Sequence, residues 1–176
     1  MAELLCQTRT LSYICPLKIT NSNKKHTISI MAFCENLSAF LTKEGFQPEA
    51  TEFGLQFKFQ GLEFVHFKDD NDELFLNLFF PQIFPVTPEN KADVLEAINT
   101  ADNDVKLAKG AIRFGNAVWV GTECALSEGY DLSAIVPRCV NAMLYYRDTF
   151  YRAYSQTPSG QAEMKKAQEN QPAPQA

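Results

Sequence analysis

The amino-acid sequence predicts an α+β domain in which three helices and a five-stranded antiparallel sheet follow one another in the order α-β-β-β-α-β-β-α. Three observations favour this class. Apolar residues recur at helical spacing over residues 30–41, alternate with polar residues over 53–59, and recur at helical spacing again over 132–154. We therefore expect the helices to cover one face of the sheet.

The first helix is predicted from residues that share one face at spacings of three and four, with its end near Gly45. A glycine adopts the left-handed conformation that commonly ends helices, and Phe46 supplies the apolar residue that follows such a cap. The residues of the buried face are Ile30, Phe33, Cys34, Leu37, Phe40 and Leu41.

Residues 53–80 are predicted to form an antiparallel meander of three strands. Residues 53–60 alternate between apolar and polar side chains, and residues 62–68 continue as a second strand after a Gln-Gly turn. A run of turn-forming residues at 69–72 then precedes the third strand at 73–80.

The third strand departs from alternation, because apolar side chains stand on both of its sides and continue to Pro85. Either both faces are covered within the fold, or one face meets a partner. The last helix adds several Tyr residues, which occupy more than one stripe and are a residue type enriched at interfaces. The candidate partner or dimer surface is therefore Phe75, Phe79, Ile83, Phe84, Tyr145, Tyr146 and Tyr151.

In the second half of the chain, Thr87-Pro88-Glu89 has the residues that begin a helix. Residues 105–113 and 117–124 are predicted to be the fourth and fifth strands. The last helix is expected from about Ala134, because Pro137 fits a helix only near its first turn.

The chain is predicted to hold one domain at residues 27–155, between a weakly ordered arm at 1–26 and a disordered tail at 156–176. The tail is rich in Gln, Ala, Pro, Ser, Glu and Lys, which bury too little apolar area to offset the entropy of ordering. Whether residues 1–30 belong to the native protein stays open, since Met31 is a possible alternative start.

The net charge of −5 and the isoelectric point near 5.1 argue against nucleic-acid or anionic-membrane binding, both of which need a basic face. The five Cys are odd in number and form no CxxC, and neither of the two His lies at metal-ligand spacing from a Cys. We expect reduced, mostly buried thiols in a cytoplasmic protein, with no metal and no cofactor.

The acidic run at 69–73 lacks the Gly and the final Glu of an EF-hand loop, so a solvated turn is favoured over a calcium site. Asp102 and Asp104, with Lys106 and Lys109, lie in no phosphate-binding loop. We interpret them as exposed charges between a helix and a strand rather than as acid–base groups.

A nucleophilic thiol needs a neighbour that stabilises its thiolate, and the sequence shows none beside Cys34, Cys124 or Cys139. His66 is the only His in the predicted domain, and we expect it at the surface or boundary of a strand rather than as a base. The sequence therefore predicts no catalytic residue.

Three segments carry a family resemblance: DDNDELFLNLFFPQIF at 69–84, ADVLEAINTADNDVKLAKGAIRFGNAVWVGTE at 92–123 and CVNAMLYYRDTFYRAY at 139–154. Across about residues 30–155 the chain resembles the YbjN-like family of bacterial regulators, which has a type III secretion chaperone-like fold. The resemblance implies a protein-binding or regulatory role, often as a homodimer, and brings no catalytic residues. The arm and the tail are not part of that pattern.

The sequence thus favours a non-enzymatic protein-interaction module, chaperone-like or regulatory, that binds a protein partner. The alternative is a small-ligand sensor with an aromatic-lined pocket between the sheet and the helices. An enzyme with an unfamiliar site is the third hypothesis, and a convergent pocket with a strongly perturbed carboxylate or thiol would favour it.

Overall fold

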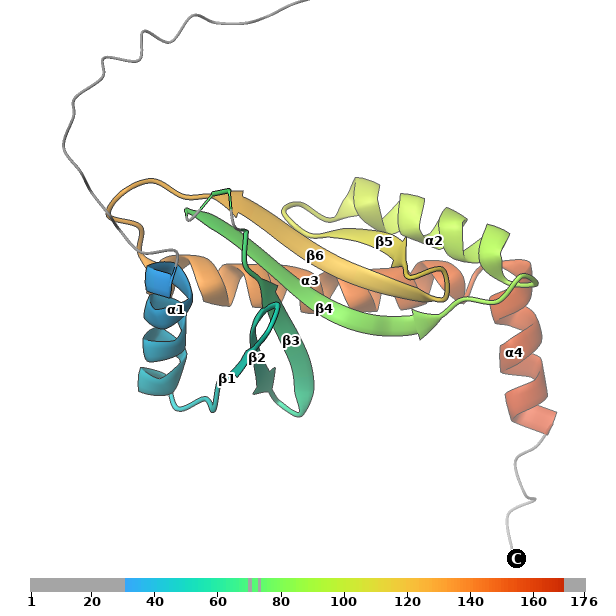
Figure 1. Cartoon of the computed structure of the whole chain (residues 1–176). Coiled ribbons are helices and arrows are strands. Elements are labelled where there is room, and N and C mark those ends of the chain that lie inside the picture. Colours follow the sequence, from blue (N-terminus) through green and yellow to red (C-terminus); the bar gives the residue numbers. More distant parts are fainter. Residues whose placement is uncertain (1–30, 70, 73, 170–176) are drawn as a thin grey trace, which may run out of the picture.

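The computed structural model describes residues 31–69, 71–72 and 74–169, so the predicted arm at 1–26 lies outside the described residues. The chain folds as a mixed α+β structure in which one antiparallel sheet lies against helices (Figure 1). The predicted class is confirmed. The predicted counts are wrong, because the described part contains six strands and four helices rather than five and three.

The first half of the chain contains helix α1 (Met31–Lys43), the hairpin strands β1 (Glu49–Thr51), β2 (Gly54–Phe59) and β3 (Leu62–Phe67), and the long strand β4 (Phe75–Pro85). The second half contains α2 (Lys91–Asp104), β5 (Lys109–Arg113), β6 (Ala117–Ala125), α3 (Leu132–Tyr154) and α4 (Pro158–Glu169). The strand order is β1-β2-β3-β4-β6-β5, and every neighbouring pair is antiparallel.

One helix end follows the sequence signal closely, and the start of α2 lies later than predicted. Gly45 has a φ of +88°, and the Phe46 N–H donates to the Leu41 carbonyl at 2.9 Å, which is the predicted glycine cap. Ahead of α2, the Thr87 N–H donates to Asn90 Oδ1 at 2.8 Å while the Asn90 N–H donates to Thr87 Oγ1 at 3.3 Å. These two bonds close the turn that leads into α2, whose N-cap residue is Asn90 rather than the predicted Thr87.

Two elements were not expected. Strand β1 has only three residues, too few for alternation to identify it. Helix α4 occupies part of the segment predicted to be a disordered tail, so that prediction is wrong for residues 158–169. Its order depends on contacts with other elements, since Ser159 N–H donates to the Asp93 carboxylate at 2.8 Å and Tyr154 donates to Glu163 at 2.8 Å.

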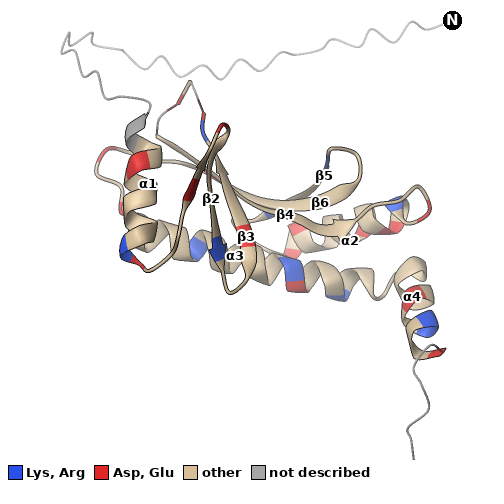
Figure 2. Ribbon diagram, turned by 60° about the horizontal axis from the view of Figure 1, so that its bottom comes forward, with Lys and Arg blue, Asp and Glu red and all other residues tan. Residues whose placement is uncertain are grey.

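The main hydrophobic core lies between the sheet and helices α1, α2 and α3. Figures 1 and 2 show these three helices on the same side of the sheet, with α3 running along it. Strand β4 contributes Leu76, Leu78 and Phe80 to this core, whereas Phe79 points to the other face of the sheet and joins a separate cluster. The apolar character of both sides of β4 is thus explained by two clusters.

Candidate functional site

The face of the sheet away from the helices carries a cluster of aromatic side chains, which we call the open aromatic face: Phe53, Phe67, Phe79, Phe114 and Trp119. Phe67, Phe79 and Trp119 come from the adjacent strands β3, β4 and β6. Phe53 and Phe114 come from the tight turns that precede β2 and β6. The register of the sheet places Phe67, Phe79 and Trp119 on one side, and ring contacts join Phe53 and Phe114 to them.

The five rings form a continuous row. Phe67 lies 6.5 Å from Phe53 and 5.5 Å from Phe79, measured between ring centroids. Trp119 lies 6.4 Å from Phe79 and 5.2 Å from Phe114, in edge-to-face geometry. These separations lie in the range of favourable aromatic pairs. The pairing holds the row together although no described helix covers it.

The two ends of the row are open to solvent. Phe114 is 78% exposed and Phe53 is 58% exposed, which is unusual for two large aromatic side chains that extend one apolar cluster. Strand β4 contains no charged residue, and β6 contains only Glu123 (Figure 2). The centre itself is closed, since Phe79 and Trp119 are only 3% and 8% exposed, so the exposed apolar surface of this face lies at its two ends.

A shallow hollow of about 320 Å³ lies beside the middle of the row, lined by Phe79, Trp119, Arg113 and Gly121 among others. Gly121 makes room for the Phe79 ring, because a Cβ at this position would collide with it. The Arg113 guanidinium stacks on Phe79, with its central carbon 4.0 Å from the ring centroid. The indole N–H of Trp119 is buried and finds no acceptor among the described residues.

The sequence-predicted surface does not form one surface. Ile83 and Phe84 are buried in the main core, where Phe84 packs on Phe150 and Tyr154 at centroid distances of 5.4 and 4.5 Å. The prediction was wrong here because the apolar residues after Phe80 follow a bulge in β4 and turn toward α3.

Tyr146 is also buried, so its assignment to a partner surface was wrong. Its hydroxyl donates to the Asp102 carboxylate at 2.7 Å, and the same carboxylate accepts the Gly110 N–H at 3.0 Å. Burial, and then the neighbouring Asp102, raise the pKa of Tyr146. This network joins α3, α2 and β5, and it has a structural role.

The remaining residues of that prediction lie apart from one another. Tyr145 and Tyr151, on α3, are 58% and 43% exposed, and the Tyr151 hydroxyl donates to the Ile83 carbonyl at 2.5 Å. Phe75 is half-buried at the start of β4, while Phe79 lies under Arg113 in the centre of the open aromatic face. Of the residues in the sequence-predicted surface, Phe79 is therefore the one that belongs to the open aromatic face.

The open aromatic face also contains residues that sequence reasoning missed. Phe53 falls in the first predicted strand, Trp119 in the fifth, and Phe114 between the fourth and fifth, with no binding role expected for any of them. A weak signal was present, since Phe114 in a Phe-Gly-Asn turn is a large apolar residue where polar residues are usual. Its convergence with Phe53, 61 positions earlier in the sequence, depends on strand pairing.

The charged residues that the sequence analysis considered for metal binding or acid–base chemistry have structural roles. Asp69 and Asp72 accept the N–H groups of Asn71 and Leu74 at 2.8 and 3.0 Å, as residues of a turn do. Lys109 donates to the carbonyls of Asp102 and Val105, the latter at 3.0 Å. Among the described residues, no group of three or more His, Cys, Asp or Glu side chains could hold a metal ion.

His66 is buried in the main core, so the prediction of a surface or boundary position was wrong. Its Nδ1 lies 3.2 Å from the Asn77 carbonyl, which requires the proton on Nδ1 and leaves Nε2 without a partner among the described residues. Burial lowers the pKa of His66 to about 4. Because the imidazole is neutral at pH 7, it cannot stabilise a thiolate as an imidazolium would.

The thiols are in surroundings that favour their neutral form. Burial raises the pKa of Cys34, which lines a small hollow with His66. Burial also raises the pKa of Cys139 to about 11, and the side chains of Thr122 and Cys124 are its neighbours. A nucleophilic cysteine is activated by a lowered pKa, so both of these raised values disfavour that role.

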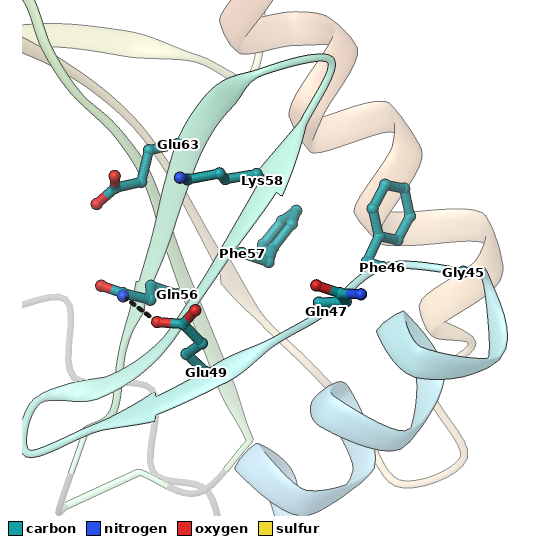
Figure 3. Close-up of a pocket in the computed structure, with 8 residues that line it drawn as sticks. All are labelled: Gly45, Phe46, Gln47, Glu49, Gln56, Phe57, Lys58 and Glu63. Carbon is teal, nitrogen blue, oxygen red and sulfur yellow. Dashed lines mark hydrogen bonds between the residues drawn. The ribbon is translucent and has the colours of Figure 1, made fainter.

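Two further hollows border β2. One of about 400 Å³ lies beside the β2–β3 hairpin, where Figure 3 shows Phe57 turned toward Phe46 and both Lys58 and Glu63 on the other side of the hairpin. Gln56 donates to Glu49 at 2.8 Å within it. The aromatic and the charged groups therefore do not converge on one point. The other is a mainly apolar groove of about 780 Å³ between α1 and the β1–β2 hairpin.

No protein-family model, curated protein or solved structure matches the chain. The likeness to the YbjN-like family therefore stays a prediction. In the described part of the chain, no helix is both long enough and apolar enough to cross a membrane.

Proposed function

We propose that this chain is a non-enzymatic protein-interaction module that binds a protein partner through its open aromatic face. The observation that carries the proposal is the row of five rings on the sheet face that no described helix covers, with Phe53 and Phe114 exposed at its two ends. Exposed aromatic side chains around an apolar centre are typical of interface hot spots.

The arrangement of the sheet supports the same conclusion. Helices α1, α2 and α3 all pack on the other side, so no described helix covers the open aromatic face. Packing a second sheet or helix on it would bury Phe53 and Phe114.

A second copy of this chain is the first partner that we propose, since a homodimer is also what the YbjN-like resemblance implies. Two open aromatic faces packed together would form a sheet-on-sheet interface, in which apolar surfaces meet about 10 Å apart. A chaperone-like or regulatory role in the cytoplasm follows as part of the same proposal. The three described cysteines, which are free thiols, fit a reducing compartment.

Light scattering on the purified chain tests the proposal. We expect a mass of twice the 19.8 kDa chain, and the monomer mass for the double variant Phe53→Glu/Phe114→Glu. The matched control is Tyr145→Glu, which places the same charge at an equally exposed aromatic residue on α3. Two results together would contradict the proposal: the wild-type chain is monomeric, and the double variant still binds the same cellular proteins as the wild type.

A small-ligand sensor remains the second candidate, and one observation favours it. The groove between α1 and the β1–β2 hairpin has a volume of about 780 Å³ and a mainly apolar lining, within the size range of small-molecule sites. Its lining contains no aromatic residue, in contrast to the predicted pocket. A compound that raises the melting temperature in proportion to its concentration would support this candidate, because ligands stabilise the native state by mass action.

A further inference from the structure

The groove between α1 and the β1–β2 hairpin has two different walls. Cys34, Ser38 and Ala39 line it from α1, and Ala50 and Leu55 line it from the hairpin. Ala39 and Ala50 are exposed and Ser38 is half-exposed, so small side chains leave the apolar space open. The groove therefore has room for a further segment of chain along the outer side of the hairpin.

Strand β1 is the edge of the sheet at this groove. Within the described residues it pairs with β2 alone, through Glu49, Ala50 and Thr51. The hydroxyl of Thr51 is buried and has no hydrogen-bond partner in the described part of the chain. An unpaired strand edge beside an apolar groove is the arrangement that binds an extended segment, whose backbone pairs with the edge while alternate side chains enter the groove.

The chain itself contains a segment of that kind. Thirty residues precede α1, and residues 11–19 within them are apolar except for Ser12 and Lys18. In an extended segment 11–19 these two polar residues would share one side with Ile14 and Pro16, and the other side would carry only apolar residues. Pro16 is compatible with an edge strand, which has a side free of ladder hydrogen bonds. The apolar side consists of Leu11, Tyr13, Cys15, Leu17 and Ile19.

The connection to α1 is long enough for this segment to reach the groove. Residues 20–30 join it to Met31 and can span about 36 Å when extended, at roughly 3.3 Å per residue. Helix α1 has 13 residues, which corresponds to a length of about 20 Å at 1.5 Å per residue. Because α1 forms one wall of the groove, a connection of this length allows residues 11–19 to lie anywhere along the length of α1.

We propose that residues 11–19 bind in this groove of the same molecule, as an added strand that pairs with the edge of β1. Residues 11–19 would then replace β1 as the edge strand of the sheet. The inference does not depend on the proposed function, since the groove and the open aromatic face use different residues.

Hydrogen exchange measured by mass spectrometry on the full chain tests this inference. We expect the backbone amides of residues 11–19 to exchange at least about 10-fold more slowly than unstructured amides, because strand pairing protects them. In the variant Ala39→Glu, the carboxylate enters the groove, and exchange at 11–19 should rise to within about 2-fold of the unstructured rate. Leu17→Asp should have the same effect from the side of the segment.

The matched control is Ala92→Glu, which makes the same change at an exposed alanine of α2 and should leave exchange at 11–19 unaltered. Since Ala39 is exposed, the variant should keep the circular dichroism of the wild type. Unprotected amides at 11–19 in the wild type would overturn the inference and leave the groove to a ligand or a partner's peptide. Protection that disappears on dilution, together with a dimer mass, would overturn it in favour of a second copy's segment.

Discussion

Tyr146 links three elements through a single carboxylate. Its hydroxyl and the Gly110 N–H both donate to Asp102 Oδ1, so α3 and β5 are joined to the end of α2. Gly110 is required at its position because a Cβ there would collide with the Tyr146 hydroxyl. A buried polar network of this kind stabilises the packing of its elements only when every member has a partner.

We expect Tyr146→Phe to lower the free energy of unfolding by about 1.5–3 kcal/mol, because it removes a hydrogen bond to a charged group in a buried site. Urea denaturation measures the change. The control is Tyr145→Phe, at the exposed neighbour, which should stay within about 0.5 kcal/mol of the wild type. Equal effects of the two variants would show that the Asp102 contact does not stabilise the fold.

His66 should make the stability of the chain depend on pH. Its pKa in the folded chain is lowered to about 4 from 6.5, because burial disfavours the charged imidazolium. The unfolded chain binds this proton more readily, so the stabilisation is fully present above pH 6.5 and is lost as the pH falls from 6.5 toward 4. The loss is on the order of 3 kcal/mol at 1.36 kcal/mol per pKa unit.

Denaturation curves of His66→Gln should therefore show a smaller decrease of stability over this pH range than the wild type. His26→Gln is the control for removal of a histidine, and it should keep the slope of the wild type. Carboxylates also titrate near pH 4, which is why the difference between the two variants is the informative quantity. Identical slopes would show that His66 is not held neutral by burial.

At the scale of elements, helix α4 shows how a segment of low hydrophobicity becomes ordered by specific contacts. It packs close to the end of α3, where a Cβ at Gly160 would collide with the Tyr154 carbonyl. Backbone and side-chain hydrogen bonds to Asp93 and from Tyr154 hold it against α2 and α3. Each contact depends on a residue far away in the sequence or on a close backbone approach.

We expect Gly160→Ala to displace α4 and to cost about 1–3 kcal/mol, as other substitutions that force extra atoms into a packed site do. Hydrogen exchange at residues 158–169 should become faster while the rest of the chain keeps its protection. Lys165→Ala, at an exposed position of the same helix, should leave exchange unchanged. If Gly160→Ala leaves exchange in α4 unaltered, the helix does not depend on the close contact with Tyr154.

At the scale of the whole molecule, the distribution of helices decides which surface is free. All three core helices cover one face of the sheet, and the opposite face keeps the aromatic row. The exposed side chains at the two ends of this face, Phe53 and Phe114, carry no charge, so association through them should depend on apolar burial rather than on ion pairs.

The proposed dimer should therefore persist in 1 M salt, where the Debye length is about 3 Å and exposed charges are screened. Sedimentation analysis at low and high salt measures this. Sulfate should strengthen the association, because excluded salts favour apolar burial. Dissociation of the dimer by salt would show that charged residues, and not the aromatic row, hold the two copies together.

Local patterns determined much of this fold. Alternation identified β2 and β3, helical spacing identified α1 and α3, and Gly45 marked a helix end that the structure confirms. These features depend on neighbours within a few residues, so a single sequence contains the information. The three-residue strand β1 and helix α4 could not be predicted, because each is stabilised by partners outside its own segment.

Only the tertiary structure decided which of the apolar residues are exposed. The sequence identified β4 as apolar on both sides, but the bulge after Phe80 sends Ile83 and Phe84 into the main core, while Phe79 is buried on the opposite face of the sheet under Arg113. Phe53 and Phe114 meet that face from two turns far apart in the sequence. Exposure is a property of the packed molecule, since it depends on which element covers a side chain, and no local period contains that information.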